Sequence, residues 1–171
     1  MDQVLARKIE ANRKGYERLL EDSNYVHVRL TPINGALSAI HKDHNFDPTI
    51  GKFGIPRGDY EKISLDVLFE NGKSIVLDSE VKNIGESAPE GLLDYVKFDI
   101  KGVEGTGRRN IISKITDAGH QGAETIVLYY HIPDVFNLPK ITNAYKGYLN
   151  LSRTKTVKTV HYIVNGKLHS I

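Results

Sequence analysis

Residues 89–101 hold the side-chain types that phosphodiester hydrolysis needs. A Pro-Glu pair, Pro89 and Glu90, is followed after eight residues by an Asp-x-Lys pair, Asp99 and Lys101. Side chains alternate across a strand, so an extended segment here puts Asp99 and Lys101 on one face. Carboxylates bind divalent cations through oxygen, and a lysine beside them can orient an attacking water and stabilise developing negative charge. The segment therefore predicts a metal-assisted nuclease site.

The second carboxylate of this site is expected on the neighbouring strand. Residues 91–101 are typical of two short strands with a tight turn near Asp94 and Tyr95. In an antiparallel hairpin, either Glu90 or Asp94 can reach the face that carries Asp99. We expect the metal ligands among these three acids, and the pattern leaves open whether Glu90 or Asp94 is the first one. The competing interpretation is an exposed ion pair between the Asp-x-Lys residues, which would be worth little.

This arrangement resembles the PD-(D/E)xK nuclease superfamily, with Glu90 in place of the first Asp and Asp99 in place of the acid before the lysine. Glu61, on a helix ahead of the first core strand, and Gln121, at the end of the helix after the lysine, stand where many of these enzymes carry an acid and a glutamine. Within the superfamily, residues 59–171 look like the C-terminal tRNase domains of CdiA-type contact-dependent inhibition toxins and their relatives on mobile elements.

The resemblance implies a metal-dependent ribonuclease that cleaves tRNA, with Mg²⁺ or Mn²⁺ as the cofactor and Zn²⁺ as a further option. The catalytic residues that it implies are Asp99, Lys101, Glu90, Asp94, Gln121 and Glu61. The acids would hold the metal, the lysine would position water or stabilise the transition state, and the glutamine would help to arrange the site. A toxin of this kind implies a cognate immunity protein as partner and activity in the cytoplasm of the producing or target bacterial cell.

His41 and His44 form a second polar cluster, together with Asp43 and Asp47. Two histidines can cleave RNA without a metal, one taking the 2′-OH proton and the other returning a proton. The same cluster could instead ligate zinc, support substrate binding at the Asp99 site, or form a polar loop without chemistry. The sequence thus leaves two alternatives open: a metal-independent ribonuclease that uses both histidines, and a non-catalytic nucleic-acid-binding module.

Positive charge gathers in the last part of the chain. Residues 135–171 contain six Lys or Arg and no Asp or Glu, whereas residues 1–134 sum to −4. A basic segment with interleaved tyrosines favours a polyanion, because Lys and Arg hold phosphates while tyrosines stack on unpaired bases. We expect Lys155 and Lys158 to contact nucleic acid. The alternative is a solvated basic face with tyrosines in the core.

Arg108 and Arg109 follow a glycine-rich segment, residues 102–107, and stand at the start of a predicted helix. Backbone N–H groups at a helix N-terminus favour an anion, so we expect both arginines to bind substrate phosphates. The alternative is a pair of solvated side chains. The segment lacks the glycine spacing of a dinucleotide fingerprint and the lysine of a P-loop, so it predicts no nucleotide cofactor site.

The elements that position these residues are read from hydrophobic periodicity. Helices are expected over residues 5–20, 60–70, 108–120 and 140–150, the second capped by Asp59. Strands are expected over residues 26–30, 36–41, 73–78, the hairpin at 91–101, 125–130, 159–164 and 167–171. The apolar strand 125–130 is expected to be central and covered on both faces. This order predicts an α/β sandwich with a mixed sheet, resembling the restriction-endonuclease-like core.

Two parts of the chain are expected: a helix and hairpin extension over residues 1–50 and a nuclease-like domain over residues 51–171. The 171 residues contain no Cys, which excludes disulfides, a thiol nucleophile and a zinc ribbon. No apolar run approaches the length of a membrane span, and the N-terminus lacks the apolar region of a secretory signal.

Overall fold

One mixed β-sheet runs through the whole computed structural model, which describes residues 2–79, 90–151, 153 and 155–171. The strands lie side by side in chain order. They are β1 (Tyr25–Leu30), β2 (Leu37–His41), β3 (Ile75–Leu77), β4 (Gly91–Leu93), β5 (Val96–Gly102), β6 (Thr125–Tyr129), β7 (Thr159–Val164) and β8 (Lys167–Ser170). The helices are α1 (Gln3–Glu21), α2 (Gly58–Glu70), α3 (Asn110–His120) and α4 (Leu138–Leu151), with a 3-10 turn at Pro133–Val135.

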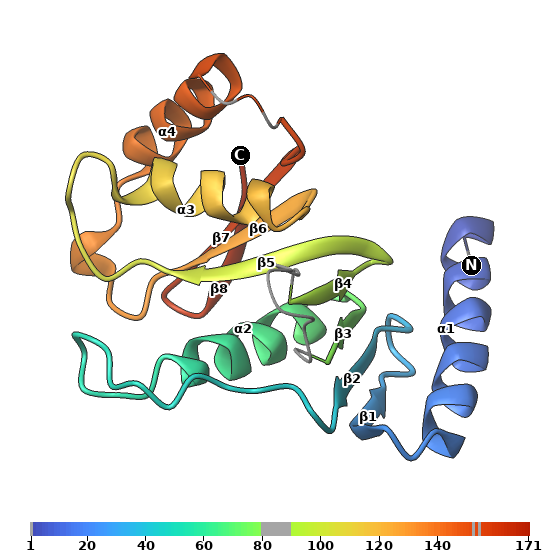
Figure 1. The fold of residues 1–171 in the computed structure, drawn as a ribbon. Helices are drawn as coiled ribbons and strands as arrows, with labels where there is room; N and C mark the ends of the chain where they lie inside the picture. Colours follow the sequence, from blue (N-terminus) through green and yellow to red (C-terminus); the bar gives the residue numbers. More distant parts are fainter. Residues whose placement is uncertain (1, 80–89, 152, 154) are drawn as a thin grey trace.

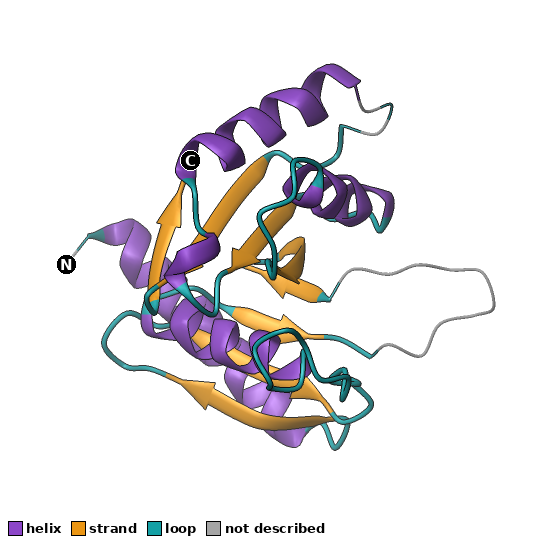
Figure 2. Ribbon diagram, turned by 90° about the vertical axis from the view of Figure 1, so that its left-hand side faces the viewer, coloured by secondary structure: helices purple, strands orange, loops and turns teal. Residues whose placement is uncertain are grey.

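Helices cover both faces of the sheet (Figures 1 and 2). Along β6, Val127 and Tyr129 join the core under α2, whereas Ile126 and Leu128 join the core under α3 and α4. Every residue of β6 is buried, which confirms the predicted central strand. The expected mixed-sheet α/β sandwich is confirmed, and the β1–β2 hairpin continues the same sheet through parallel pairing of β2 with β3.

Local turn chemistry sets the hairpins that the sequence predicts. Asp94 and Tyr95 have φ of 47° and 68° between β4 and β5, and Asn165 and Gly166 have φ of 53° and 68° between β7 and β8. Two successive positive φ values are those of a type I′ turn, whose twist matches that of paired strands. Both turns therefore fix the register of the strands that they join.

The start of α2 differs from the prediction. The helix begins at Gly58, with Arg57 at the N-cap, so Asp59 is not the cap but lies inside the first turn with Glu61. Carboxylates in the first turn interact favourably with the positive end of the helix dipole. Asp59 and Glu61 are therefore compatible with this end of α2, although neither side chain caps the helix. Among the described residues, none of the helices has the length and hydropathy needed to span a membrane.

The loop between β2 and α2, residues 42–57, folds back onto the start of α2. The Gly58 N–H donates to the Asp47 carbonyl at 2.7 Å. A Cβ at Gly58 would lie 2.7 Å from the Phe46 Cβ and 2.8 Å from the Asp47 nitrogen. Because backbone atoms approach this closely, only glycine allows the loop to rest against the helix.

Substitution of Gly58 by Ala is expected to lower the free energy of unfolding by about 1–3 kcal/mol, since the added methyl group overlaps backbone that cannot rotate away. Denaturant unfolding measures the change. Gly107→Ala is the matched control, because a Cβ at Gly107 meets nothing within 4 Å. The control is expected to stay within ~0.5 kcal/mol of the unmodified chain. Equal stability of the two variants would contradict the packing argument.

Candidate active site and metal centre

Glu90 lies directly before β4, at the open end of the β4–β5 hairpin. The register pairs Gly91 with Phe98, and Asp99 follows Phe98 on β5. The Asp78 N–H donates to the Glu90 carbonyl at 3.0 Å, so the backbone at Glu90 is held against the segment that follows β3. Pro89, the other half of the predicted motif, lies outside the described residues.

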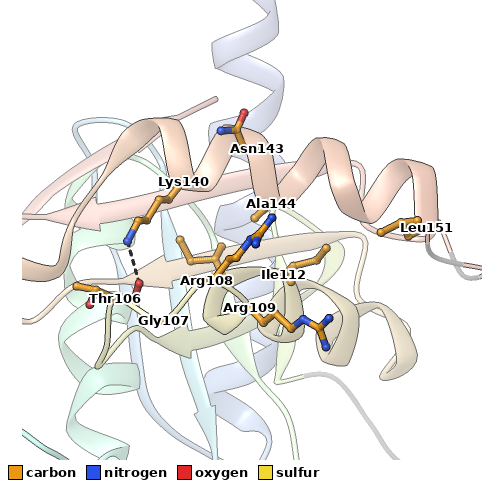
Figure 3. Close-up of a pocket in the computed structure, with 10 residues that line it drawn as sticks. Thr106, Gly107, Arg108, Arg109, Ile112, Lys140, Asn143, Ala144 and Leu151 are labelled. Atoms are coloured by element: carbon orange, nitrogen blue, oxygen red, sulfur yellow. Dashed lines mark hydrogen bonds between the residues drawn. The ribbon is translucent and has the colours of Figure 1, made fainter.

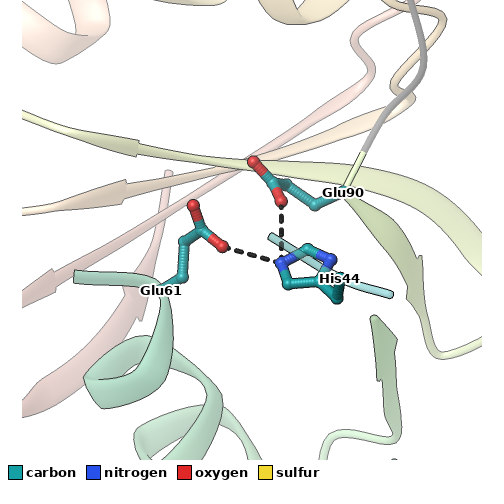
Figure 4. A group of neighbouring side chains, drawn as sticks. All are labelled: His44, Glu61 and Glu90. Atoms are coloured by element: carbon teal, nitrogen blue, oxygen red, sulfur yellow. Dashed lines mark hydrogen bonds and ion pairs between the residues drawn. The ribbon is translucent and has the colours of Figure 1, made fainter. Parts of the chain in front are cut away.

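Glu61 and His44 complete a cluster with Glu90 (Figure 4). His44 Nε2 lies 2.9 Å from Glu61 Oε2 and 3.6 Å from Glu90 Oε2. One ligand atom from each of the three residues lies within 4.8 Å of the others. Glu61 comes from the first turn of α2, Glu90 from the start of β4, and His44 from the loop that rests on α2. Three distant segments thus meet in one group able to hold a cation.

Asp99 and Lys101 form an ion pair on β5, with the carboxylate buried and the lysine partly exposed. Lys101 Nζ lies 2.8 Å from Asp99 Oδ2, and the Asp99 side chain is only 1% exposed. Lys101 Nζ also donates to Gln121 Oε1 at 3.4 Å, a long contact from the C-cap of α3. The other oxygen, Asp99 Oδ1, is buried and has no hydrogen-bond donor among the described residues. A buried carboxylate oxygen in this state is costly unless a cation or water meets it. In the neighbouring cluster, one imidazole nitrogen and two carboxylate oxygens are a donor set that fits a divalent metal.

A cavity of about 360 Å³ is lined by Lys101 and by the two glutamates of the cluster. Its lining includes the carboxylates of Glu61 and Glu90 and the cations Lys101, Lys114 and Arg57. Burial lowers the pKa of Lys114, and the neighbouring charge of Lys101 lowers it further. A cavity lined by both carboxylates and cations suits a bound metal ion next to a phosphate group.

Glu104 holds the rim of the same cavity. Arg57 Nε lies 2.8 Å from Glu104 Oε1, and the Tyr60 hydroxyl donates to Glu104 Oε2 at 3.2 Å. Burial, followed by the charge of Glu104, raises the pKa of Tyr60 to about 12, which keeps this hydroxyl protonated. The rim is therefore a fixed network, and part of the Arg57 charge is already balanced by Glu104.

Neither a protein-family model nor a curated protein matches the chain. A solved structure shares its fold. That structure is the CdiA-CT/CdiI toxin and immunity complex from Burkholderia pseudomallei, matched with a TM-score of 0.50 and 19% identity over 78% of this chain and 98% of the solved chain. At this identity the likeness establishes the α/β fold, and the function has to be argued from the side chains of the site.

Asp94, the other candidate for the first acid, lies at the closed end of the hairpin. Its Oδ1 accepts a hydrogen bond from the Ser74 N–H at 2.9 Å, and its Oδ2 lies 3.4 Å from Lys73 Nζ. Glu90 lies at the open end, in the cluster with His44 and Glu61. Of the two acids, the structure brings Glu90 and not Asp94 to the site.

The two histidines of the second predicted cluster have different surroundings. His41 Nδ1 accepts the Asp43 N–H at 3.1 Å, and its ring packs edge-on to Tyr25 with centroids 5.2 Å apart. The His44 side chain is fully buried beside Glu61. The structure therefore attaches His44 to the carboxylate site and leaves His41 in a separate set of contacts.

The predicted phosphate-binding residues lie outside the metal cluster. Arg108 and Arg109 line a groove of about 620 Å³ between the start of α3 and α4 (Figure 3). Lys158 Nζ lies 3.0 Å from Glu124 Oε1 in an exposed ion pair, and Lys155 is exposed. The loop before α3 connects the two hollows, since Glu104 lines the cavity and Thr106 and Gly107 line the groove.

Several cavity residues were not predicted from the sequence, among them Arg57, Glu104 and Lys114, and for Lys114 a signal was present. Lys114 lies on α3 at helical spacing from buried Ala118 and from Gln121, four and seven residues later. Residues at these intervals share one face of a helix. Because Gln121 was expected at the site, the same face predicts that Lys114 points there too. The spacing was the available signal.

Replacing Lys114 by Met is expected to raise the midpoint of thermal unfolding at pH 7 by a few degrees, because it removes a half-buried charge next to Lys101. The lowered pKa fixes the sign of the pH dependence: the folded chain releases this proton more readily than the unfolded chain. The cost of the charge therefore falls as the pH rises through the folded pKa towards the ordinary lysine value of 10.5. Melting curves at pH 7 and 10 measure the gap between variant and parent, and a gap that widens at pH 10 would contradict this account.

Proposed function

We propose that this chain is a metal-dependent ribonuclease, a toxin domain that cleaves tRNA. The observation that carries the proposal is the meeting of Glu61, Glu90 and His44 beside the Asp99–Lys101 pair, at a cavity that also holds Lys114. Carboxylates that hold a divalent cation next to an anchored lysine are the components of metal-assisted phosphodiester hydrolysis.

In this mechanism the carboxylates of Glu61 and Glu90 would hold the cation, and Asp99 would anchor Lys101 beside it. When bound, a divalent cation lowers the pKa of a coordinated water and polarises a phosphoryl oxygen. Lys101 is held in place by Asp99 on one side and by Gln121 on the other. Its remaining N–H donors can orient the attacking water or stabilise the negative charge that develops on the phosphate.

Lys114 adds a further positive charge to the lining of the cavity. Because burial and Lys101 both disfavour its charge, a bound phosphate would relieve a cost that the free protein carries. The site is thus built to prefer an anionic substrate over an empty cavity.

Two further observations support RNA as the substrate, a role as a toxin and an immunity protein as the partner. Residues 135–171 carry six basic and no acidic side chains, a charge distribution that favours a polyanion. The fold is shared with a chain of a toxin and immunity complex. The substrate is proposed as tRNA, the partner as a cognate immunity protein, and the place of action as the cytoplasm of a bacterial cell.

The burial of His44 favours the metal-dependent reaction over one carried out by His41 and His44 alone. The His44 side chain has no exposed surface, and its Nε2 faces Glu61 rather than open solvent. A general acid or base must come within hydrogen-bond distance of the proton that it transfers, and the ring is enclosed on that side.

The test is a gel of purified chain with total tRNA in Mg²⁺, Mn²⁺, Zn²⁺ and EDTA. The parent chain is expected to give discrete products with a divalent metal and none in EDTA. Lys101→Ala and Asp99→Asn are each expected to lower the cleavage rate by at least about 100-fold, because the first removes the positive charge at the reacting phosphate and the second removes the carboxylate that anchors that charge. Lys97→Ala, an exposed lysine on the same strand, is the matched control and is expected to cleave at the parent rate.

Circular dichroism of each variant separates loss of catalysis from loss of folding. Cleavage that persists in EDTA and in both site variants would contradict the proposal and move the chemistry to the histidines. RNA that binds and remains intact with every metal would favour the binding-module alternative.

A further inference from the structure

The orientation of the His44 ring is fixed by contacts on two sides. Nδ1 lies 2.8 Å from the backbone carbonyl of Asp78. The Phe46 ring packs edge-on to the imidazole, with centroids 4.8 Å apart and planes at 70°. A carbonyl oxygen can only accept, so Nδ1 carries the hydrogen in this contact and Nε2 is the nitrogen that faces the carboxylates. The side chain is held before any ligand arrives.

This arrangement is the one that metal-binding histidines use. Such a histidine donates one ring N–H to a backbone carbonyl or carboxylate, which sets the tautomer and aims the other nitrogen at the metal. Here Nε2 converges with one oxygen from Glu61 and one from Glu90, all within 4.8 Å of one another. The three residues come from separate segments, so their meeting is a product of the tertiary fold and not of local sequence.

We propose that His44 Nε2 is a metal ligand, and that with Glu61 and Glu90 it makes a three-ligand site that selects Zn²⁺ over Mg²⁺. The inference rests on the proposed function and names the ion for the same site. Mg²⁺ prefers an octahedron of oxygens, whereas imidazole nitrogen suits zinc and other transition ions. Three protein ligands with a position left for water or substrate is the pattern of catalytic zinc.

Asp99 keeps a separate task in this assignment. Its Oδ2 lies 2.8 Å from Lys101 Nζ, which makes it the anchor of the catalytic lysine. The metal ligands are then His44, Glu61 and Glu90, and Asp99 acts through Lys101, which lines the same cavity as the two glutamates. The sequence predicts carboxylate ligands for the metal, and this assignment adds the imidazole nitrogen of His44 to them.

The test is isothermal titration calorimetry on metal-free chain without RNA, using ZnCl₂, MnCl₂ and MgCl₂ in turn. Zn²⁺ is expected to bind with one-to-one stoichiometry and more tightly than Mg²⁺. His44→Gln is expected to weaken Zn²⁺ binding by at least about 10-fold, since even outer-sphere partners of a metal ligand change affinity by 10- to 100-fold. His41→Gln, three residues away and with other contacts, is the matched control and is expected to keep the parent affinity.

X-ray absorption at the zinc edge of the parent chain keeps the test independent of any variant's folding. The inference predicts a spectrum in which the zinc neighbours are one imidazole ring and oxygen ligands. It is overturned if the zinc neighbours are oxygens only, if the parent chain does not bind Zn²⁺, or if a folded His44→Gln variant binds Zn²⁺ as tightly as the parent.

These outcomes are separable from those of the proposed function. A chain that binds Zn²⁺ through His44 but leaves RNA intact would contradict the nuclease and leave the ligand assignment standing. A chain that cleaves tRNA with Mg²⁺ and binds zinc without His44 would support the nuclease and contradict the ligand assignment.

Discussion

The backbone pairing of β5 governs this site. β5 is hydrogen-bonded to β4 on one side and to β6 on the other, and its alternation sends Phe98 and Ile100 into the core under α2. Asp99 and Lys101 are consequently turned towards α3, where Gln121 meets the lysine. A slip of one residue would exchange the two faces, turning Lys101 into the core under α2 and the apolar pair towards α3. The chemistry of the cavity therefore depends on a register that hydrophobic burial enforces.

Much of this arrangement follows from local rules, and the sequence therefore predicts it. The alternation of Asp99 and Lys101, the turn at Asp94 and the buried strand of residues 125–130 are properties of short segments. Gln121 follows from the resemblance and lies where a helix of the expected length ends. In each case the residues that decide the outcome are neighbours in the chain.

The remaining features depend on contacts between distant segments. The choice between Glu90 and Asp94 is decided by the direction of a hairpin and by which end of it lies open. The contact between His44 and Glu61 depends on a loop that packs against α2 at Gly58. The residues on either side of His44 or Glu61 do not predict this contact. The predicted N-cap of α2 at Asp59 is wrong for a similar reason. The loop places Arg57 at the N-cap position, so Asp59 falls inside the first turn.

The three clustered residues span positions 44 to 90 of the chain, and each belongs to a different element. A chain that had formed α2 or the β4–β5 hairpin alone would hold a fragment of the group and lack its geometry. Assembly of the cluster requires closure of two long loops, which slows its formation relative to local structure. The site is therefore complete only in the folded protein, and a nascent or partly unfolded chain is expected to be inactive.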